Sequence, residues 1–107
     1  MVITLFRNRL RSEALEEYER WAHRMNQLAS TMPGFVSIKT FAADDGERIS
    51  VVEFDSEAAH GAWRNHPEHR EAQRLGRERF YDEFQIQVCA PVRRYAFSRT
   101  AGRGRQD

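Results

Sequence analysis

Residues 35–54 read FVSIKTFAADDGERISVVEF, and this stretch decides the fold. Two runs rich in β-branched and aromatic residues, Phe35–Ala42 and Arg48–Phe54, have the composition of short strands. The residues between them, Ala43–Glu47, contain the Asp-Gly pair that is typical of a hairpin turn. We therefore expect two antiparallel strands at the centre of the chain, with the flanking segments completing the sheet.

The segment that precedes the hairpin predicts one strand and one long helix. Residues Val2–Leu10 are rich in β-branched and aromatic side chains, as a strand requires. From Leu15 to Met32, apolar side chains recur every three or four residues, which is the spacing of one helix face. Ser12 is a suitable N-cap for this helix, and Pro33–Gly34 ends it.

The segment that follows the hairpin predicts a broken helix and a last strand. The pair Asp55–Ser56 offers a cap for the first helical part. Pro67 fits the first turn of a second helical part, because its missing N–H has no partner to lose there. The apolar alternation of Phe84–Ala90 predicts the last strand, which we expect to extend past Pro91 to Phe97.

The order strand, helix, strand, strand, helix, strand predicts an α+β domain. Right-handed connections give a ferredoxin-like βαββαβ fold, a four-stranded antiparallel sheet with the helices on one face. Apolar residues occur on both faces of the strands, so a second copy of the sheet is the simplest cover for the other face. We therefore expect a homodimer packed through the sheet face. The domain is predicted over residues 1–97, with residues 98–107 as a basic, disordered tail.

Composition and motifs exclude several classes of function. Seventeen Lys and Arg residues against sixteen Asp and Glu residues give a net charge of +1, which does not suggest a nucleic-acid partner. The single cysteine, Cys89, permits neither an intrachain disulfide nor a cysteine-based metal cluster. Phosphate-binding glycine loops, nucleophile elbows and zinc-protease motifs are absent from the sequence. No apolar stretch or signal-peptide pattern points to a membrane, so we expect a cytoplasmic protein.

Residues 60–69, which read HGAWRNHPEH, contain the densest group of chemically capable side chains. His66 and His69 stand three residues apart, so both imidazoles can approach one cavity. Structural roles are also open: Trp63 as a core aromatic residue, His66 as a helix cap and His69 as an exposed residue. Two histidines do not complete a metal site, so no metal is expected.

Two polar side chains outside this segment are further candidates for binding a ligand. Asn8 shares a strand face with Phe6, and an amide on a covered face must find a hydrogen-bond partner in the protein or in a ligand. Tyr81 is expected to be half-buried, with a hydroxyl able to hydrogen-bond a phenolic substrate.

Several short stretches of the sequence resemble one known family. They are Phe6–Asn8, Met32–Phe35, Ala62–His69, Gly76–Arg77 and Phe80–Tyr81. Together they resemble the antibiotic biosynthesis monooxygenase (ABM) domain family, over about residues 1–97. The resemblance implies a dimeric α+β barrel. It also implies a monooxygenase without metal or organic cofactor, which oxidises a small phenolic, anthrone or quinol-type substrate with dioxygen.

The resemblance also implies roles for individual residues. Trp63 matches the tryptophan of the substrate pocket, and His66 or His69 is the expected base or hydrogen-bond donor. The asparagine that precedes this tryptophan in phenol-oxidising members is missing, since Ala59 and His60 stand there. The residues expected to bind the substrate are Asn8, Phe6, Asn65 and Tyr81.

Two alternative functions remain open at this point. Haem-degrading relatives use an asparagine on the first strand, a tryptophan on the second helix and a histidine ligand about ten residues further on. Asn8 and Trp63 match the first two, and haem would then be the cofactor, but Gln73 stands at the ligand position and is a poor iron ligand. The other alternative is a non-catalytic dimeric small-molecule-binding or accessory protein, because this fold hosts many functions.

Overall fold

Four antiparallel strands form one sheet in the order β2-β3-β1-β4 in the computed structural model, which describes residues 1–99. This order and the helical connections between the strands confirm the ferredoxin-like α+β fold. In the hairpin, Gly46 has a φ of 92°, a conformation that glycine adopts without strain. The strands are β1 (Val2–Leu10), β2 (Phe35–Ala42), β3 (Arg48–Phe54) and β4 (Tyr81–Cys89).

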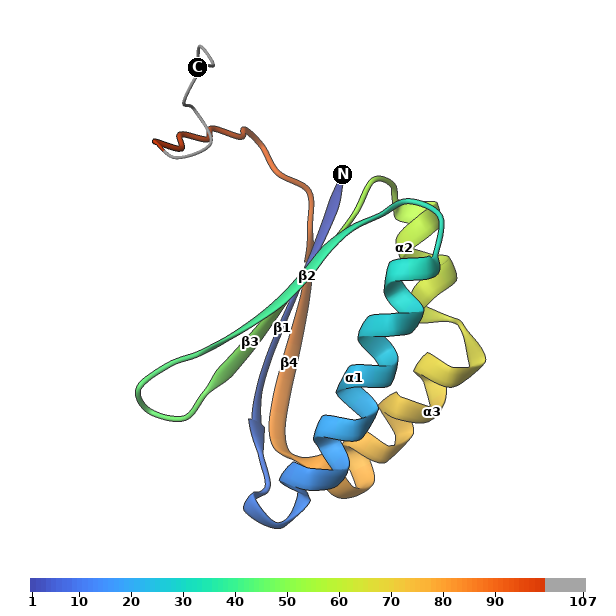
Figure 1. Ribbon diagram of the computed structural model, residues 1–107, viewed down its shortest axis with the longest axis vertical. Helices are drawn as coiled ribbons and strands as arrows, with labels where there is room; N and C mark the ends of the chain where they lie inside the picture. Colours follow the sequence, from blue (N-terminus) through green and yellow to red (C-terminus); the bar gives the residue numbers. More distant parts are fainter. Residues whose placement is uncertain (100–107) are drawn as a thin grey trace.

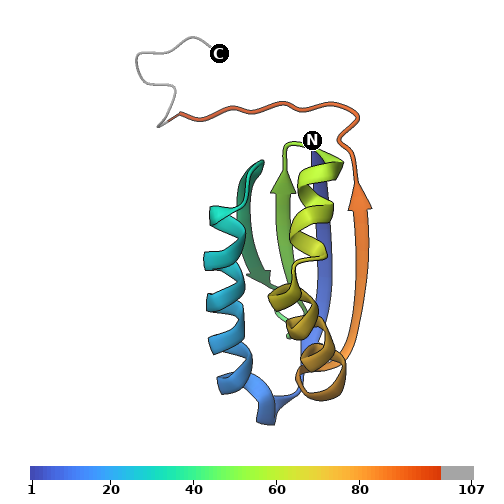
Figure 2. The ribbon, with the colours of Figure 1, turned by 90° about the vertical axis from the view of Figure 1, so that its right-hand side faces the viewer.

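The helices all pack on one face of this sheet, as the sequence predicts (Figures 1 and 2). The other face carries the alternate side chains of the strands and has no helical cover among residues 1–99. None of the helices in the described part of the chain has the length and hydrophobicity needed to cross a membrane. The helical elements are η1 (Ser12–Ala14), α1 (Leu15–Thr31), α2 (Glu57–Arg64), α3 (Pro67–Leu75) and η2 (Gly76–Phe80).

The last strand differs from the predicted one at both ends. It begins at Tyr81, three residues early, because a register shift in β1 lets Leu10 pair with Tyr81. It ends at Cys89, and the predicted extension to Phe97 is wrong. Pairing with β1 ends at Cys89, and Pro91 lacks the N–H that a further pairing would need. Residues 100–107 of the predicted tail lie outside the described residues.

The start of the first helix also differs from the prediction. Ser12 is not an N-cap but the first residue of the 3-10 turn η1, whose start has no side-chain hydrogen bond. The α-helix proper begins three residues later, at Leu15. The physical reason is that Arg11 continues the extended backbone of β1, so the chain needs a tight turn before α1 can start.

The helices α2 and α3 each begin with a side-chain cap, and the cap of α3 lies at the break between them. The side chain of Ser56 accepts a hydrogen bond from the backbone N–H of Ala59 at 3.1 Å and starts α2. Nδ1 of His66 accepts from the N–H of Glu68 at 3.1 Å, and Pro67 is the first residue of α3. The expected helix start at Pro67 is therefore confirmed, and the cap is the preceding histidine.

The interior of the domain is divided into two apolar clusters. One lies around the start of α1 and the end of η2, and the other lies between α2 and the far ends of α1 and β3. The space between them remains open and is described below. The first cluster contains Ala14, Tyr18, Leu75 and Phe80, and the second contains Ala29, Val52, Phe54 and Trp63.

Candidate functional site

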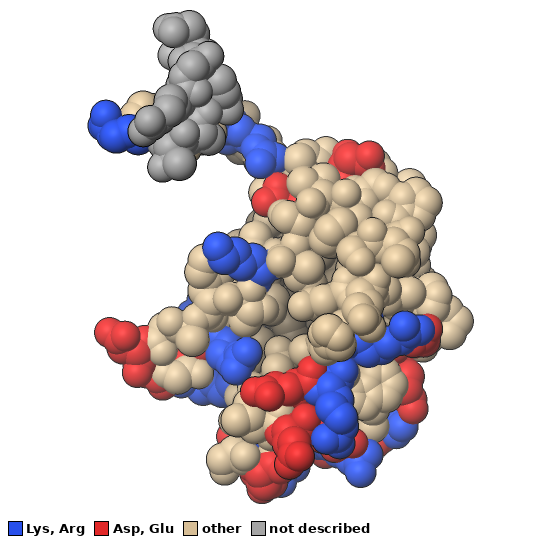
Figure 3. Space-filling model, viewed as in Figure 1, with Lys and Arg blue, Asp and Glu red and all other residues tan. Residues whose placement is uncertain are grey.

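A cavity of about 630 Å³ separates the sheet from the helices. Tyr18 and Phe80 of the first cluster and Val52 and Trp63 of the second cluster line it, so the cavity occupies the gap in the core. Figure 3 shows the surface hollowed between the sheet and the helices, with acidic and basic side chains interleaved elsewhere on this face. An apolar cavity of this size, with a few polar groups, suits a small aromatic ligand.

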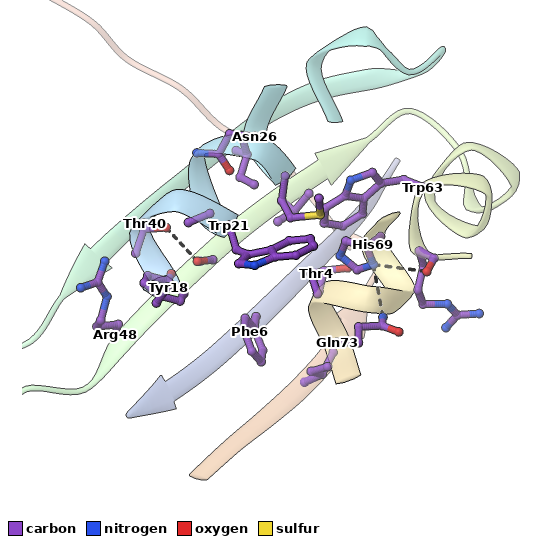
Figure 4. A pocket seen from close by; sticks show the side chains of 18 of the residues that line it. Thr4, Phe6, Tyr18, Trp21, Asn26, Thr40, Arg48, Trp63, His69 and Gln73 are labelled. Carbon is purple, nitrogen blue, oxygen red and sulfur yellow. Dashed lines mark hydrogen bonds between the residues drawn. The ribbon is translucent and has the colours of Figure 1, made fainter. Parts of the chain in front are cut away.

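Trp63 and His69 form one wall of this cavity (Figure 4). Their ring centroids lie 4.1 Å apart, although one residue belongs to α2 and the other to α3. The helix break at Pro67 makes this approach possible, because it turns the first residues of α3 back toward the last turn of α2. The structure therefore brings the tryptophan and one of the two candidate histidines to the same cavity.

The hydrogen bonds of His69 leave one ring nitrogen free. Nδ1 lies 3.2 Å from the carbonyl oxygen of Arg64 and 3.2 Å from Nε2 of Gln73. A carbonyl oxygen can only accept, whereas a side-chain amide can present its oxygen or its nitrogen after a half-turn. We therefore assign the proton to Nδ1, which donates it to Arg64. The lone pair is then on Nε2, which has no hydrogen-bond partner among residues 1–99.

The charge state of His69 also suits a base. Removal from water lowers the pKa of His69 below its ordinary value of 6.5, and this effect outweighs the hydrogen bond to Arg64. The imidazole is therefore neutral near pH 7 and can accept a proton on Nε2.

His60 is a site residue that the sequence analysis did not single out. Its side chain is buried, and Nε2 lies 2.5 Å from Oγ1 of Thr4. Both residues line the cavity. Burial lowers the pKa of His60, and the charge of Arg64 lowers it further. A usable signal was present, because His60 stands three residues before Trp63 and must share its helix face.

Phe6 and Tyr81 line the cavity, whereas Asn8 is not one of its lining residues. The rings of Phe6 and Tyr81 meet edge to face, with centroids 5.3 Å apart. Burial raises the pKa of Tyr81, so its hydroxyl stays protonated and can donate a hydrogen bond. Asn8 is 2% exposed, and its Oδ1 has no partner among the described residues.

His66 and Asn65 lie outside the lining of the cavity. The ring of His66 is engaged as the cap of α3, which is the structural role considered above. Asn65 is exposed at the C-terminal end of α2, where its backbone N–H bonds back to the helix. The structure thus brings one of the two candidate histidines to the cavity and leaves the other at the helix junction.

Arg48 and Tyr18 also line the cavity, and sequence reasoning did not single them out as site residues. Arg48 is half-buried on β3, and its guanidinium lies over the Tyr18 ring, 5.4 Å from the centroid. Burial raises the pKa of Tyr18, and the charge of Arg48 opposes this rise. Strand alternation could have placed Arg48 on the same face as Val52, but no sequence spacing relates it to a residue of α1.

The histidine ligand of the haem-degrading relatives is missing from its expected position in this chain. Gln73 stands at the position of the iron ligand and is in contact with His69. Within residues 1–99, no group of three or more His, Cys, Asp or Glu side chains is placed to hold a metal ion.

Comparison with known proteins identifies relatives in sequence and in structure. The profile of the family described as "Antibiotic biosynthesis monooxygenase" matches residues 1–75. The protein YqjZ of Bacillus subtilis (strain 168), which is named as uncharacterized, is 34% identical over 88 residues, which cover 82% of this chain and 77% of YqjZ.

Solved structures show the same fold at low sequence identity. Rv0793 from Mycobacterium tuberculosis has a TM-score of 0.78 at 19% identity, over 89% of this chain and 98% of Rv0793. A variant of SnoaB from Streptomyces nogalater, described as a cofactor-independent oxygenase, has a TM-score of 0.75 at 15% identity, over 87% of this chain and 94% of SnoaB.

Proposed function

Because the chain belongs to the antibiotic biosynthesis monooxygenase family, we propose that it oxidises a small aromatic substrate of the phenol, anthrone or quinol type with dioxygen. The reaction uses neither a metal nor an organic cofactor. The observation that carries the proposal is the neutral imidazole of His69, which lines an apolar cavity with one nitrogen free. The description of SnoaB as a cofactor-independent oxygenase supports the same chemistry.

In the proposed reaction, His69 removes a proton from the substrate and Trp63 holds the aromatic ring. Nε2 accepts the proton, and the resulting substrate anion supplies electrons to dioxygen. One oxygen atom replaces two substrate hydrogens, and the other oxygen leaves with those hydrogens as water. The apolar walls exclude bulk water from the anion while it reacts. Tyr81, held protonated by burial, donates a hydrogen bond to a substrate oxygen.

The proposed enzyme is a homodimer that packs through the outer face of its sheet. Strand alternation places Ile3 and Leu5 of β1 on this face, opposite the helices, where Leu5 pairs with Val51 of β3 and Ile49 lies two residues before Val51. Phe41 of β2 pairs with Ile49 and is 49% exposed. An apolar surface formed by three neighbouring strands supports burial against a second copy.

The experiment measures conversion of anthrone and naphthohydroquinone under isotopically labelled dioxygen and under anaerobic conditions. We expect one labelled oxygen atom per product molecule and no product without dioxygen. His69→Ala should lower kcat/KM by about 10²- to 10⁴-fold, the usual contribution of a general base. His23→Ala on the exposed side of α1 is the matched control and should behave as the parent protein.

Three outcomes would contradict the proposal. Product formation without dioxygen would exclude an oxygenase. Equal activity of the His69→Ala and His23→Ala variants would remove His69 as the base. Tight binding of both compounds without any conversion would instead favour the binding or accessory protein.

A further inference from the structure

Arg48 differs from the other arginines of the sheet. Arg7 pairs with Glu47 at 2.8 Å, and Arg9 pairs with Asp45 at 2.9 Å. Arg48 forms no ion pair with a carboxylate of residues 1–99, and its Nε is buried without a hydrogen-bond partner. It is also the arginine of the three that lines the cavity.

The neighbours of Arg48 hold the guanidinium in place without neutralising it. The guanidinium carbon lies 5.4 Å from the centroid of the Tyr18 ring, within the range of a cation–π contact. Asn8 stands opposite in the strand register, but its amide is neutral and the two side chains form no hydrogen bond. Glu19 is the acidic residue of the cavity lining, and it is exposed on α1. Arg64 adds a second cation to the lining, whereas the ammonium of Lys39 lies over the Phe41 ring, on the outer face of the sheet.

A partly buried guanidinium without a counter-charge is suited to a carboxylate. Desolvating a charge without a counter-charge is unfavourable, and a bound anion restores the balance. A carboxylate can accept two parallel hydrogen bonds from one guanidinium. Because Nε of Arg48 is covered by the protein, the terminal N–H groups are the donors proposed for the ligand.

We propose that the cavity binds an aromatic carboxylic acid whose carboxylate pairs with Arg48. Figure 4 shows Arg48 and His69 at opposite ends of the cavity, with Phe6 between them. The acid group therefore anchors one end of the ligand while its ring reaches Trp63 and His69. That this far end is the reacting end rests on the function proposed above, whereas the pairing of the carboxylate with Arg48 does not.

Calorimetry under anaerobic conditions tests the pairing with two matched probes, hydroxynaphthoic acid and its neutral amide. We expect the parent protein to bind the acid about 10- to 100-fold more tightly than the amide, as a charge-assisted pair requires. Arg48→Gln should reduce this ratio to about one while the protein still binds the amide. Arg48→Lys should keep part of the preference for the acid, since lysine keeps the charge but lacks the parallel N–H donors of the guanidinium. Arg7→Gln, on the outer face, should keep all of it.

Equal binding of the two probes by the parent protein, or no binding of either, would overturn the proposal. So would an acid preference that survives in Arg48→Gln. These outcomes are separate from those of the oxygenase experiment. An acid preference without oxygen-dependent turnover would leave the carboxylate site standing and remove the oxygenase. Oxygen-dependent turnover without a preference for the acid would support the oxygenase and remove the carboxylate site.

Discussion

At the scale of single residues, His69 is the side chain on which the proposed chemistry depends. The proton on Nδ1 is held by the Arg64 carbonyl, and removal from water keeps the ring neutral. Both effects arise from the fold, because an exposed histidine would titrate near 6.5 and leave its tautomer unfixed.

The lowered pKa of His69 predicts the pH dependence of the reaction. Protonation on Nε2 removes the lone pair, so kcat/KM should fall as the pH falls. Because the pKa of His69 in the folded protein lies below the ordinary value of 6.5, the midpoint of the fall in kcat/KM should also lie below 6.5. The rate profile between about pH 4.5 and 8 checks this, with His23→Ala as control. A midpoint above 6.5 would contradict the assignment of His69 as the base.

Gly34 is a residue at which both the backbone conformation and the neighbouring atoms disfavour a side chain. Its φ is +86°, and an added Cβ would lie 2.5 Å from Cβ of Ala59. Gly34→Ala should therefore lower the free energy of unfolding in urea by about 2 kcal/mol or more. Gly61, inside α2 with nothing near its Cβ position, is the matched control. Gly61→Ala should raise stability by about 0.5–1 kcal/mol, and equal effects of the two changes would contradict this account.

Sequence spacing identified the site residues that lie on one helical segment or one strand, and it did not identify their neighbours across the fold. Trp63 and His69 were found because seven residues contain both the helix break and the two rings. Arg48 and Tyr18 were missed because they are thirty residues apart and meet only when β3 packs beneath α1. Whether an imidazole caps a helix, as His66 does, or lines a cavity depends on a rotation that spacing does not determine.

At the scale of elements, the junction between α2 and α3 determines where His69 lies. The cap formed by His66 fixes the first turn of α3, to which His69 belongs. Loss of this cap should fray that turn.

We therefore expect His66→Ala to lower the free energy of unfolding by about 1 kcal/mol. His66→Asn should restore most of the loss, since asparagine is a favourable N-cap. Urea unfolding of the three proteins measures both effects. If the asparagine variant is as unstable as the alanine variant, the contribution of His66 is not that of a cap.

Strand and helix bounds were predictable where local chemistry decides them. The hairpin, the Pro33–Gly34 stop and the start at Pro67 depend on residues that are special by themselves. The end of β4 depends on the length of its neighbour, because a strand needs a partner and β1 pairs with it only as far as Cys89. The alternating pattern of residues 84–92 contains no information about where β1 begins.

At the scale of the whole molecule, the uncovered face of the sheet predicts the oligomeric state. Leu5 lies at its centre, paired with Val51 on one side and Gln87 on the other. Leu5→Glu should halve the mass measured by light scattering, because it places a charge in the proposed dimer interface. Gln27→Glu, on the exposed side of α1, should leave the mass unchanged. A parent protein that is monomeric at about 50 μM would contradict the proposed dimer.

The two separate apolar clusters have a consequence for how this protein can change over evolutionary time. Phe54 and Leu75 contribute to stability and do not line the cavity, whereas Ser50 and Ile86 line the cavity and belong to neither cluster. Substitutions at positions such as Ser50 and Ile86 can therefore alter which ligands fit the cavity with little effect on folding. A domain with such residues can change the shape of its cavity while it keeps its fold.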